Sequence, residues 1–129
     1  MHDILVGARS ELKVTVTPEM AISFLGEDGP RVLSTPQMIL YMERVCRTML
    51  LPMLQPGHDS LGTKVCVSHL AAAPVGAESV FSAEITSVDE KRVGFRIEAW
   101  SGDTKLGEGT HQRTIINVAR FSGKMAKNG

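Results

Sequence analysis

Three residues of this chain could do acid–base or nucleophilic chemistry from within largely apolar segments: Thr35, Glu43 and His69. Glu43 lies at the edge of the apolar stripe in the run STPQMILYMERVC. A carboxylate at such a place is costly unless it is paired, solvated or used. It either reaches water or pairs with Arg44 or Arg47, or it points into a cleft and acts there as a base or nucleophile.

His69 and Thr35 each allow two interpretations as well. His69 lies between Val67 and Ala71 in an alternating segment. It is either a buried histidine with one satisfied nitrogen or an imidazole that binds a substrate carbonyl or moves a proton near neutral pH. Thr35 is most simply a helix cap. If the helix N-terminus faces a cleft, its hydroxyl and the free backbone N–H groups would also stabilise a developing oxyanion.

Other motifs of catalytic or cofactor sites are absent from the sequence. The four histidines show no HxH or HExxH spacing, which argues against a zinc site; they are His2, His58, His69 and His111. The chain contains no GxGxxG or GxxxxGK phosphate loop, and no GxSxG turn of a serine α/β-hydrolase. We therefore predict neither a metal nor a cofactor.

The composition indicates a soluble globular protein. Hydrophobic residues make up 43% and charged residues 22% of the chain, and 14 basic residues balance 14 acidic ones without a basic block, so we expect no nucleic-acid partner. No apolar run approaches the roughly 18 residues of a transmembrane helix, and the start MHDILVGARSE is unlike a signal peptide. We predict a cytoplasmic protein with no membrane partner. Cys46 and Cys66 lack CxxC spacing and are expected to be buried free thiols.

One long helix is predicted to carry Thr35 and Glu43. It begins at 34–36, where either Thr35 before a proline or Ser34 with a glutamine three residues later supplies the N-cap, and a Pro-Gly pair at 56–57 ends it. Its apolar residues recur at intervals of three and four and leave Glu43 at the stripe's edge. They are Ile39, Met42, Cys46, Met49, Leu50 and Met53.

The remainder of the chain is predicted to form strands, because polar and apolar residues alternate in it. These strands cover residues 11–17, 62–74, 78–88, 92–101 and 105–118. Residues 18–32, rich in Gly and Pro, predict a short helical turn or a lid-like loop. The expected fold class is α+β, with a five-stranded antiparallel sheet wrapped around one long helix. We expect a single domain over 1–129, in which residues 122–129 fray.

This layout leaves one edge strand and one flank of the sheet uncovered. A homodimer that extends the sheet is therefore expected. Gly107 and Gly109 in the last strand indicate that another backbone or a ligand approaches closely there.

Three blocks of the sequence resemble the fluoroacetyl-CoA thioesterase branch of the hot-dog-fold thioesterases. They are TPQMILYMERVC at 35–46, GHDSLGTKVCVSHLAAAPVG at 57–76 and GEGTHQRTIIN at 107–117. The similarity extends from about residue 5 to 122 and keeps the order and spacing of that branch. It implies a hot-dog fold, in which an antiparallel sheet wraps a long helix, usually in a dimer.

The resemblance also implies an active site. That branch uses a Thr and a Glu eight residues apart on the helix and a His 26 residues further on, and these positions hold Thr35, Glu43 and His69. Gly62 matches a glycine beside the substrate carbonyl, and Arg113 matches an arginine near the site.

The implied reaction is hydrolysis of an acyl-CoA thioester. Thr35 and backbone donors would stabilise the oxyanion, Glu43 would attack or activate water, and His69 would orient water or protonate the thiolate. The fluoroacetyl enzyme selects its acyl group with aromatic residues before the helix, whereas residues 21–32 here offer only Phe24 as an acyl contact. We therefore predict a short or medium acyl-CoA as the substrate.

Two other functions are compatible with the same fold. A non-catalytic module would bind acyl-CoA as a sensor or carrier, but it would need no carboxylate beside an apolar pocket. A hydratase or dehydratase would act on the β-carbon, and its usual Asp-His or Glu-His segments have no clear counterpart in this chain.

Overall fold

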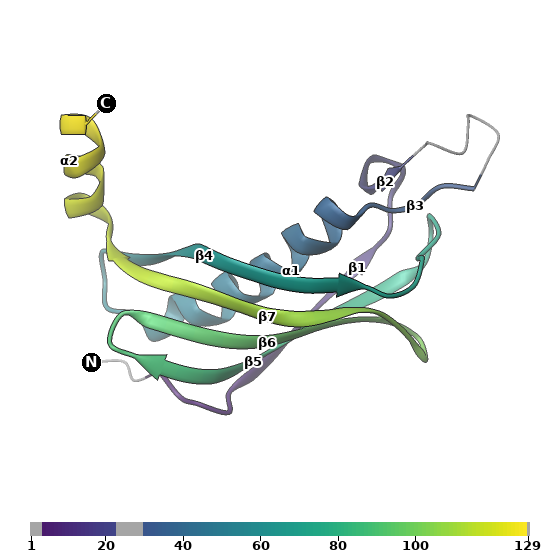
Figure 1. The fold of residues 1–129 in the computed structure, drawn as a ribbon, viewed down its shortest axis with the longest axis horizontal. Helices are drawn as coiled ribbons and strands as arrows, with labels where there is room; N and C mark the ends of the chain where they lie inside the picture. The colour runs from purple at the N-terminus through teal and green to yellow at the C-terminus, as the bar shows by residue number, and fades with distance from the viewer. Residues whose placement is uncertain (1–3, 23–29, 129) are drawn as a thin grey trace.

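A curved antiparallel sheet of five strands wraps around helix α1 (Thr35–Leu50) in the computed structural model, which describes residues 4–22 and 30–128 (Figure 1). The strand order is β1-β5-β6-β7-β4. Their bounds are β1 (Arg9–Thr15), β4 (His58–His69), β5 (Glu78–Asp89), β6 (Arg92–Ser101) and β7 (Thr104–Asn117). The predicted α+β class is confirmed, and β1 and β4 form the two edges.

Smaller elements connect these parts. A 3₁₀ turn at Pro18–Met20 and a two-stranded sheet of β2 (Ala21–Ile22) and β3 (Val32–Leu33) occupy the segment predicted as a helical turn or lid-like loop. Phe24, predicted to contact the acyl group, lies outside the described residues. A second 3₁₀ turn at Leu51–Met53 follows α1, and helix α2 (Val118–Asn128) follows β7.

Strand β4 differs from its prediction at both ends. It begins at His58, because the polar residues HDS pair with the end of β7 whatever their side chains are, and it stops at His69 rather than at residue 74. A bulge at Thr63 shifts the register between Gly62 and Lys64. The inserted residue changes which positions face the helix: Ser60 before the bulge and Val65, Val67 and His69 after it are at least partly buried.

Helix α1 buries a broader stripe than the sequence predicts. Its buried residues are Met38, Met42, Val45, Cys46, Met49 and Leu50. Ile39 is only partly buried, and Met53 packs against the core from the following turn rather than from the helix, so the predicted stripe is wrong at these two positions. Burial raises the pKa of the Cys46 thiol to about 12, which keeps it protonated and inert. Glu43 is half-buried at the edge of the stripe, as predicted.

Two glycines of β7 allow α1 and the neighbouring strand β4 to approach β7 closely. A Cβ atom at Gly107 would lie 2.6 Å from Met38 Sδ and 2.9 Å from the carbonyl oxygen of Ser68. At Gly109 it would overlap the carbonyl oxygen of Cys66 and lie 2.7 Å from Val67 Cα. The predicted close approach of another backbone is therefore confirmed, because no other residue type leaves this space.

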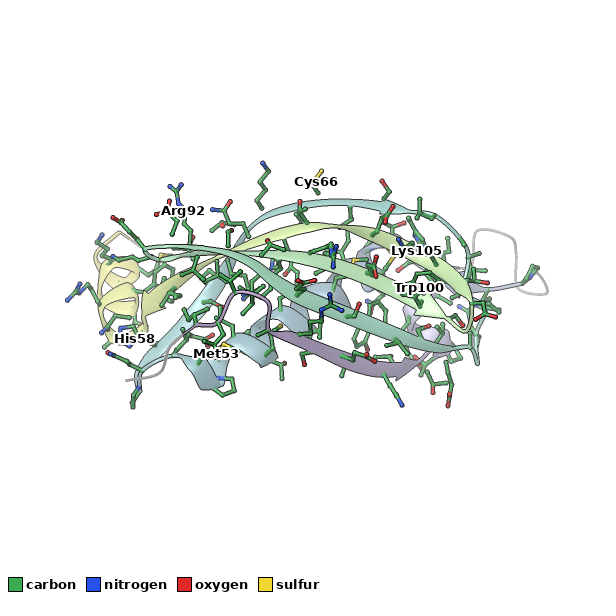
Figure 2. All side chains as sticks on the ribbon, turned by 90° about the horizontal axis from the view of Figure 1, so that it is seen from below. Met53, His58, Cys66, Arg92, Trp100 and Lys105 are labelled. Carbon is green, nitrogen blue, oxygen red and sulfur yellow. The ribbon has the colours of Figure 1, made fainter. Side chains whose placement is uncertain are left out.

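Two expectations about the surface are wrong. Cys66 is exposed, because alternation turns it away from α1 while Val65 and Val67 face inward (Figure 2). The tail expected to fray is helical as far as Asn128; Asn117 Oδ1 accepts a hydrogen bond from Arg120 N at 2.9 Å and so caps the start of α2. No helix within 4–22 and 30–128 is both long and apolar enough to cross a membrane. The cytoplasmic location stays a prediction.

Gly109→Ala is expected to lower the free energy of unfolding by about 1–3 kcal/mol, because the added methyl group would force the backbones of β4 and β7 apart. Gly123→Ala is the matched control, since a Cβ atom at that position of α2 meets nothing within 4 Å. Urea unfolding followed by circular dichroism measures both variants. Equal stabilities would contradict the packing role of Gly109.

Candidate active site

Thr35 and His69 lie in direct contact. Thr35 is the first residue of α1 and His69 is the last residue of β4, and Thr35 Oγ1 lies 2.7 Å from His69 Nδ1. His69 pairs with Gly107 across the sheet. Because Gly107 has no side chain, Met38 in the first turn of α1 packs onto the sheet next to this pair. The predicted Thr and His are therefore brought together by helix–sheet packing.

Ser34, not Thr35, caps the helix. The Ser34 side chain accepts a hydrogen bond from Gln37 N at 3.3 Å, and Ser34 O accepts one from Met38 N at 3.0 Å. Since Pro36 has no N–H and the N–H groups of Gln37 and Met38 are bonded to Ser34, the helix start offers few free donors. The side chain of Thr35 is thus free of the capping role, and its contact is with the imidazole.

His69 leaves one ring nitrogen for chemistry. Its Nε2 atom is buried and has no hydrogen-bond partner among the residues of 4–22 and 30–128. Buried polar atoms are normally hydrogen-bonded, so such an atom calls for a partner such as a ligand, a water molecule or another chain. Both interpretations of His69 share the held nitrogen, and the free Nε2 atom is the one that a substrate or water molecule would use.

Among the described residues, Glu43 forms no structural ion pair. Arg47 donates from Nε and Nη2 to Asp59 Oδ1 and Oδ2 at 3.1 and 2.6 Å, and the Arg44 guanidinium lies 4.8 Å from the centre of the Tyr41 ring. Within the part of the chain that the structure describes, Glu43 has no ion-pair or hydrogen-bond partner. Pairing with Arg44 or Arg47 therefore does not explain the carboxylate at the stripe's edge.

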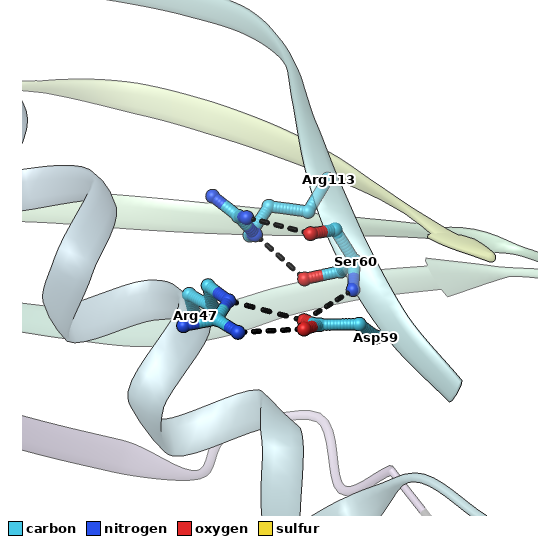
Figure 3. A network of polar contacts seen from close by, with 4 residues as sticks. All are labelled: Arg47, Asp59, Ser60 and Arg113. Atoms are coloured by element: carbon cyan, nitrogen blue, oxygen red, sulfur yellow. Dashed lines mark hydrogen bonds and ion pairs between the residues drawn. The ribbon is translucent and has the colours of Figure 1, made fainter. Parts of the chain in front are cut away.

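A buried arginine lies on the strand facing β4. Arg113, only 5% exposed, donates from Nε to Ser60 Oγ at 2.7 Å and from Nη2 to Ser60 O at 2.9 Å. Figure 3 shows this guanidinium beside that of Arg47, the two meeting the consecutive residues Asp59 and Ser60 of β4. Burial lowers the pKa of Arg113, whereas the charge of Glu43 opposes that change and favours the guanidinium cation.

His111 completes the network around Arg113. Its Nδ1 atom lies 2.9 Å from the carbonyl oxygen of Lys64, and its Nε2 atom lies 3.1 Å from Arg113 Nη1. A carbonyl can only accept and a guanidinium can only donate, so the imidazole is neutral with its proton on Nδ1. Burial, aided by the nearby Arg113 charge, lowers the pKa of His111, in agreement with this assignment.

Gly62 lies beside this network. A Cβ atom at Gly62 would lie 3.0 Å from His111 Cε1 and 3.5 Å from Arg113 Nη1, so the glycine leaves space next to the guanidinium. The predicted site residues thus form two groups in one chain, Thr35 with His69, and Gly62 with Arg113 near the Glu43 charge.

Sequence reasoning missed His111 and Ser60. His111 was considered only as a possible zinc ligand, although it stands two positions before Arg113 and hence on the same face of a strand. That spacing is the pattern that could have revealed it. No group of three His, Cys, Asp or Glu side chains that could hold a metal ion occurs among the described residues.

His111→Gln is expected to make stability less dependent on pH. Because the native state lowers the pKa of His111 below its ordinary value of 6.5, the unfolded chain binds the extra proton more readily, and stability falls as pH drops through and below that value. Urea unfolding at about pH 8 and about pH 5.5 would show a smaller difference for the variant. The same difference in both proteins would contradict the neutral assignment.

Comparison with known proteins agrees with the fold and with the resemblance noted in the sequence. The family described as fluoroacetyl-CoA-specific thioesterase matches residues 16–119. A fluoroacetyl-CoA thioesterase of Streptantibioticus cattleyicolor is 34% identical over 126 residues, which cover 93% of this chain and 91% of that protein. A solved structure of fluoroacetyl-CoA thioesterase is 33% identical with a TM-score of 0.89 and covers 98% of both chains. A thioesterase superfamily member from Thermus thermophilus is 30% identical with a TM-score of 0.89, covering 98% of this chain and 94% of that one. The chain therefore belongs to the fluoroacetyl-CoA thioesterase family of hot-dog thioesterases.

Proposed function

We propose that this protein is an acyl-CoA thioesterase that hydrolyses a short or medium acyl-CoA to the free acid and CoA. The observation that carries the proposal is the Thr35–His69 contact of 2.7 Å at the start of α1, with a buried and unpartnered Nε2 atom beside it. Solved structures of variants of fluoroacetyl-CoA thioesterase hold acetyl-CoA, or CoA with fluoroacetate. A thioester is thus the substrate class that suits this pair of residues.

The tautomer of His69 determines which group the Thr35 hydroxyl can donate its proton to. A threonine hydroxyl has one proton to donate, so it can serve either the imidazole or an oxyanion. When His69 carries its proton on Nδ1, that N–H donates to Thr35 Oγ1, and the Thr35 hydroxyl proton is free for the oxygen of the tetrahedral intermediate. His69 Nε2 is then an acceptor that orients the attacking water.

Glu43 is the general base or the nucleophile of the proposed reaction. As a base it takes a proton from that water, whose oxygen bonds to the thioester carbon, and the C–S bond then breaks, so that the free acid forms and CoA leaves as the thiolate. As a nucleophile it bonds to the thioester carbon itself, the C–S bond breaks to release the thiolate, and water then hydrolyses the resulting anhydride to the free acid and restores Glu43. Arg113 is the nearby buried cation, and the charge of Glu43 favours its guanidinium form. Gly62 leaves room for the substrate carbonyl beside that cation.

Glu43 works with a threonine and histidine of a second chain in this proposal. Eight residues separate Thr35 from Glu43, which is roughly 12 Å along an α-helix and too far for both to contact one carbonyl group. A two-fold pairing of β4 edges would run the two strands in opposite directions. It would bring Thr35 and His69 of the partner subunit towards Glu43 and Gly62.

Strand β4 has the properties of such an interface. It is 12 residues long, lies at the edge of the sheet, and offers unpaired backbone groups along its outer side. Leu61 within the strand and Leu70 directly after it are 40% and 52% exposed. A homodimer joined by this edge would cover these groups and form two equivalent sites.

Glu43→Gln and His69→Ala are each expected to lower kcat about 10²–10⁴-fold, because a proton acceptor is lost in each case. Thr35→Val should lower it about 10²-fold through loss of an oxyanion donor. The assay follows thiol release from a panel of acyl-CoA thioesters of increasing chain length.

Ser34→Ala is the matched control for Thr35→Val. It should lower the free energy of unfolding by about 1 kcal/mol through loss of the cap, while kcat stays near that of the unchanged protein. If the unchanged protein binds acyl-CoA but releases no CoA, the sensor or carrier function replaces the proposal. If Glu43→Gln is as active as the unchanged protein, the role given to Glu43 is wrong.

Mixing two inactive variants tests the shared site. Thr35→Val and Glu43→Gln, unfolded and refolded together in equal amounts, would form hybrid dimers in which one site has both intact residues. The mixture should recover roughly a quarter of the activity of the unchanged protein, since half the dimers are hybrids with one good site each. Activity no higher than the mean of the two variants would show that each chain supplies its whole site.

A further inference from the structure

A hollow of about 420 Å³ lies at the end of the sheet where α2 begins, away from the Thr35–His69 contact. It is formed by residues 114–117 of β7, the tip of the β5–β6 hairpin and the first turns of α2. Its wall includes the cations Lys91, Arg120 and Lys124. We call it the basic hollow.

The three cations of the basic hollow lack ion-pair partners in the part of the chain that the structure describes. Among the described residues none of the three forms an ion pair, while Arg9, Arg47, Arg96 and Lys105 elsewhere do. Glu90 is the one acidic residue of the lining. In a chain with equal numbers of acidic and basic residues, such a gathering of unpaired positive charge favours an anionic ligand.

An aromatic ring and a side-chain amide lie next to these charges. Phe121 lines the basic hollow and is 36% exposed, so part of its ring is available to a planar group. Asn117 uses its Oδ1 atom to cap α2, which leaves its amide N–H groups as donors. Several cations beside an aromatic ring and an amide are the features that bind a phosphorylated nucleoside.

The position of the basic hollow relates it to the proposed site. Along β4, His58 in its lining is four residues from Gly62, and along β7, Asn117 is four residues from Arg113. Four residues of a strand span roughly 13 Å, a separation that the extended pantetheine arm of CoA is suited to bridge. Figure 1 shows α2 projecting beyond the edge formed by β4. In the proposed dimer this end therefore lies beside Thr35 and His69 of the partner subunit.

We propose that the basic hollow binds the 3′-phosphorylated ADP end of CoA. Lys91, Arg120 and Lys124 contact its phosphates, and Phe121 supports the adenine ring. This inference rests on the proposed thioesterase function, because it places one end of the same substrate. It explains how the acyl-CoA is held by a part of the molecule that does no chemistry.

Comparison of two thioesters tests the proposal. Arg120→Gln combined with Lys124→Gln should raise KM for acetyl-CoA roughly tenfold, because charge-assisted contacts to phosphate are lost, and should leave kcat unchanged. For S-acetyl-pantetheine, which has no nucleotide, KM and kcat should both be unchanged. Lys13→Gln combined with Arg9→Gln removes the same charge from the opposite edge of the sheet and should change neither substrate's KM.

Other outcomes would overturn the inference. If the double variant has an unchanged KM for acetyl-CoA, the nucleotide does not bind in the basic hollow. If KM rises equally for both thioesters, the substitutions act through the structure of α2. If the unchanged protein releases CoA from no member of the acyl-CoA panel, the proposed function fails, and the basic hollow is then judged by calorimetry with adenosine 3′,5′-bisphosphate. Binding that the double variant loses supports it, and absence of binding refutes it.

Discussion

The close packing of α1 against the curved sheet is the constraint on which the other features depend. One helix must cover the concave face of five strands, and it can come near enough only because β7 has glycines where Met38 and the β4 backbone press against it. The same approach brings the start of α1 to the end of β4, where Thr35 meets His69. Core packing and site geometry are therefore set by the same contacts, as is usual where interiors are close-packed.

The buried charge of Arg113 is the second constraint on the structure. Arg113 is a cation inside the protein, and a buried cation is tolerated only when its hydrogen bonds are made and a counter-charge is near. Ser60 and a neutral His111 provide the hydrogen bonds, and Glu43 provides the charge. The charges of Glu43 on the helix and Arg113 on the sheet thus attract each other. The described residues form no direct ion pair with Glu43 that would keep its carboxylate from a substrate.

Much of the fold could be predicted from the sequence, and the reasons for the failures are local. Alternation located all five strands of the main sheet, and periodicity located α1 with Glu43 at its edge. The start of β4 was missed because its residues HDS pair through backbone atoms, which carry no side-chain pattern. Cys66 was expected to be buried because of its residue type, although its place in the alternation turns it outward.

The candidate site was harder to predict, because its roles depend on contacts between distant segments. Thr35 could be recognised as a residue of interest, but only the structure shows that Ser34 takes the capping role and leaves the Thr35 hydroxyl to His69. Ser60 and His111 gained meaning only through Arg113, which lies 53 and two positions away from them.

The bulge at Thr63 has a consequence for how relatives of this chain should be compared. Gly62 and His69 are an odd number of positions apart, yet the extra residue lets both face the helix. Removing one residue there would restore strict alternation and turn either the glycine or the histidine to the outer surface. Conservation of these two residue types is therefore insufficient evidence that a homologue has the same site. In a homologue that keeps both residues but lacks the inserted one, one of the two faces away from the helix. The count of residues between them is the better mark of an intact site.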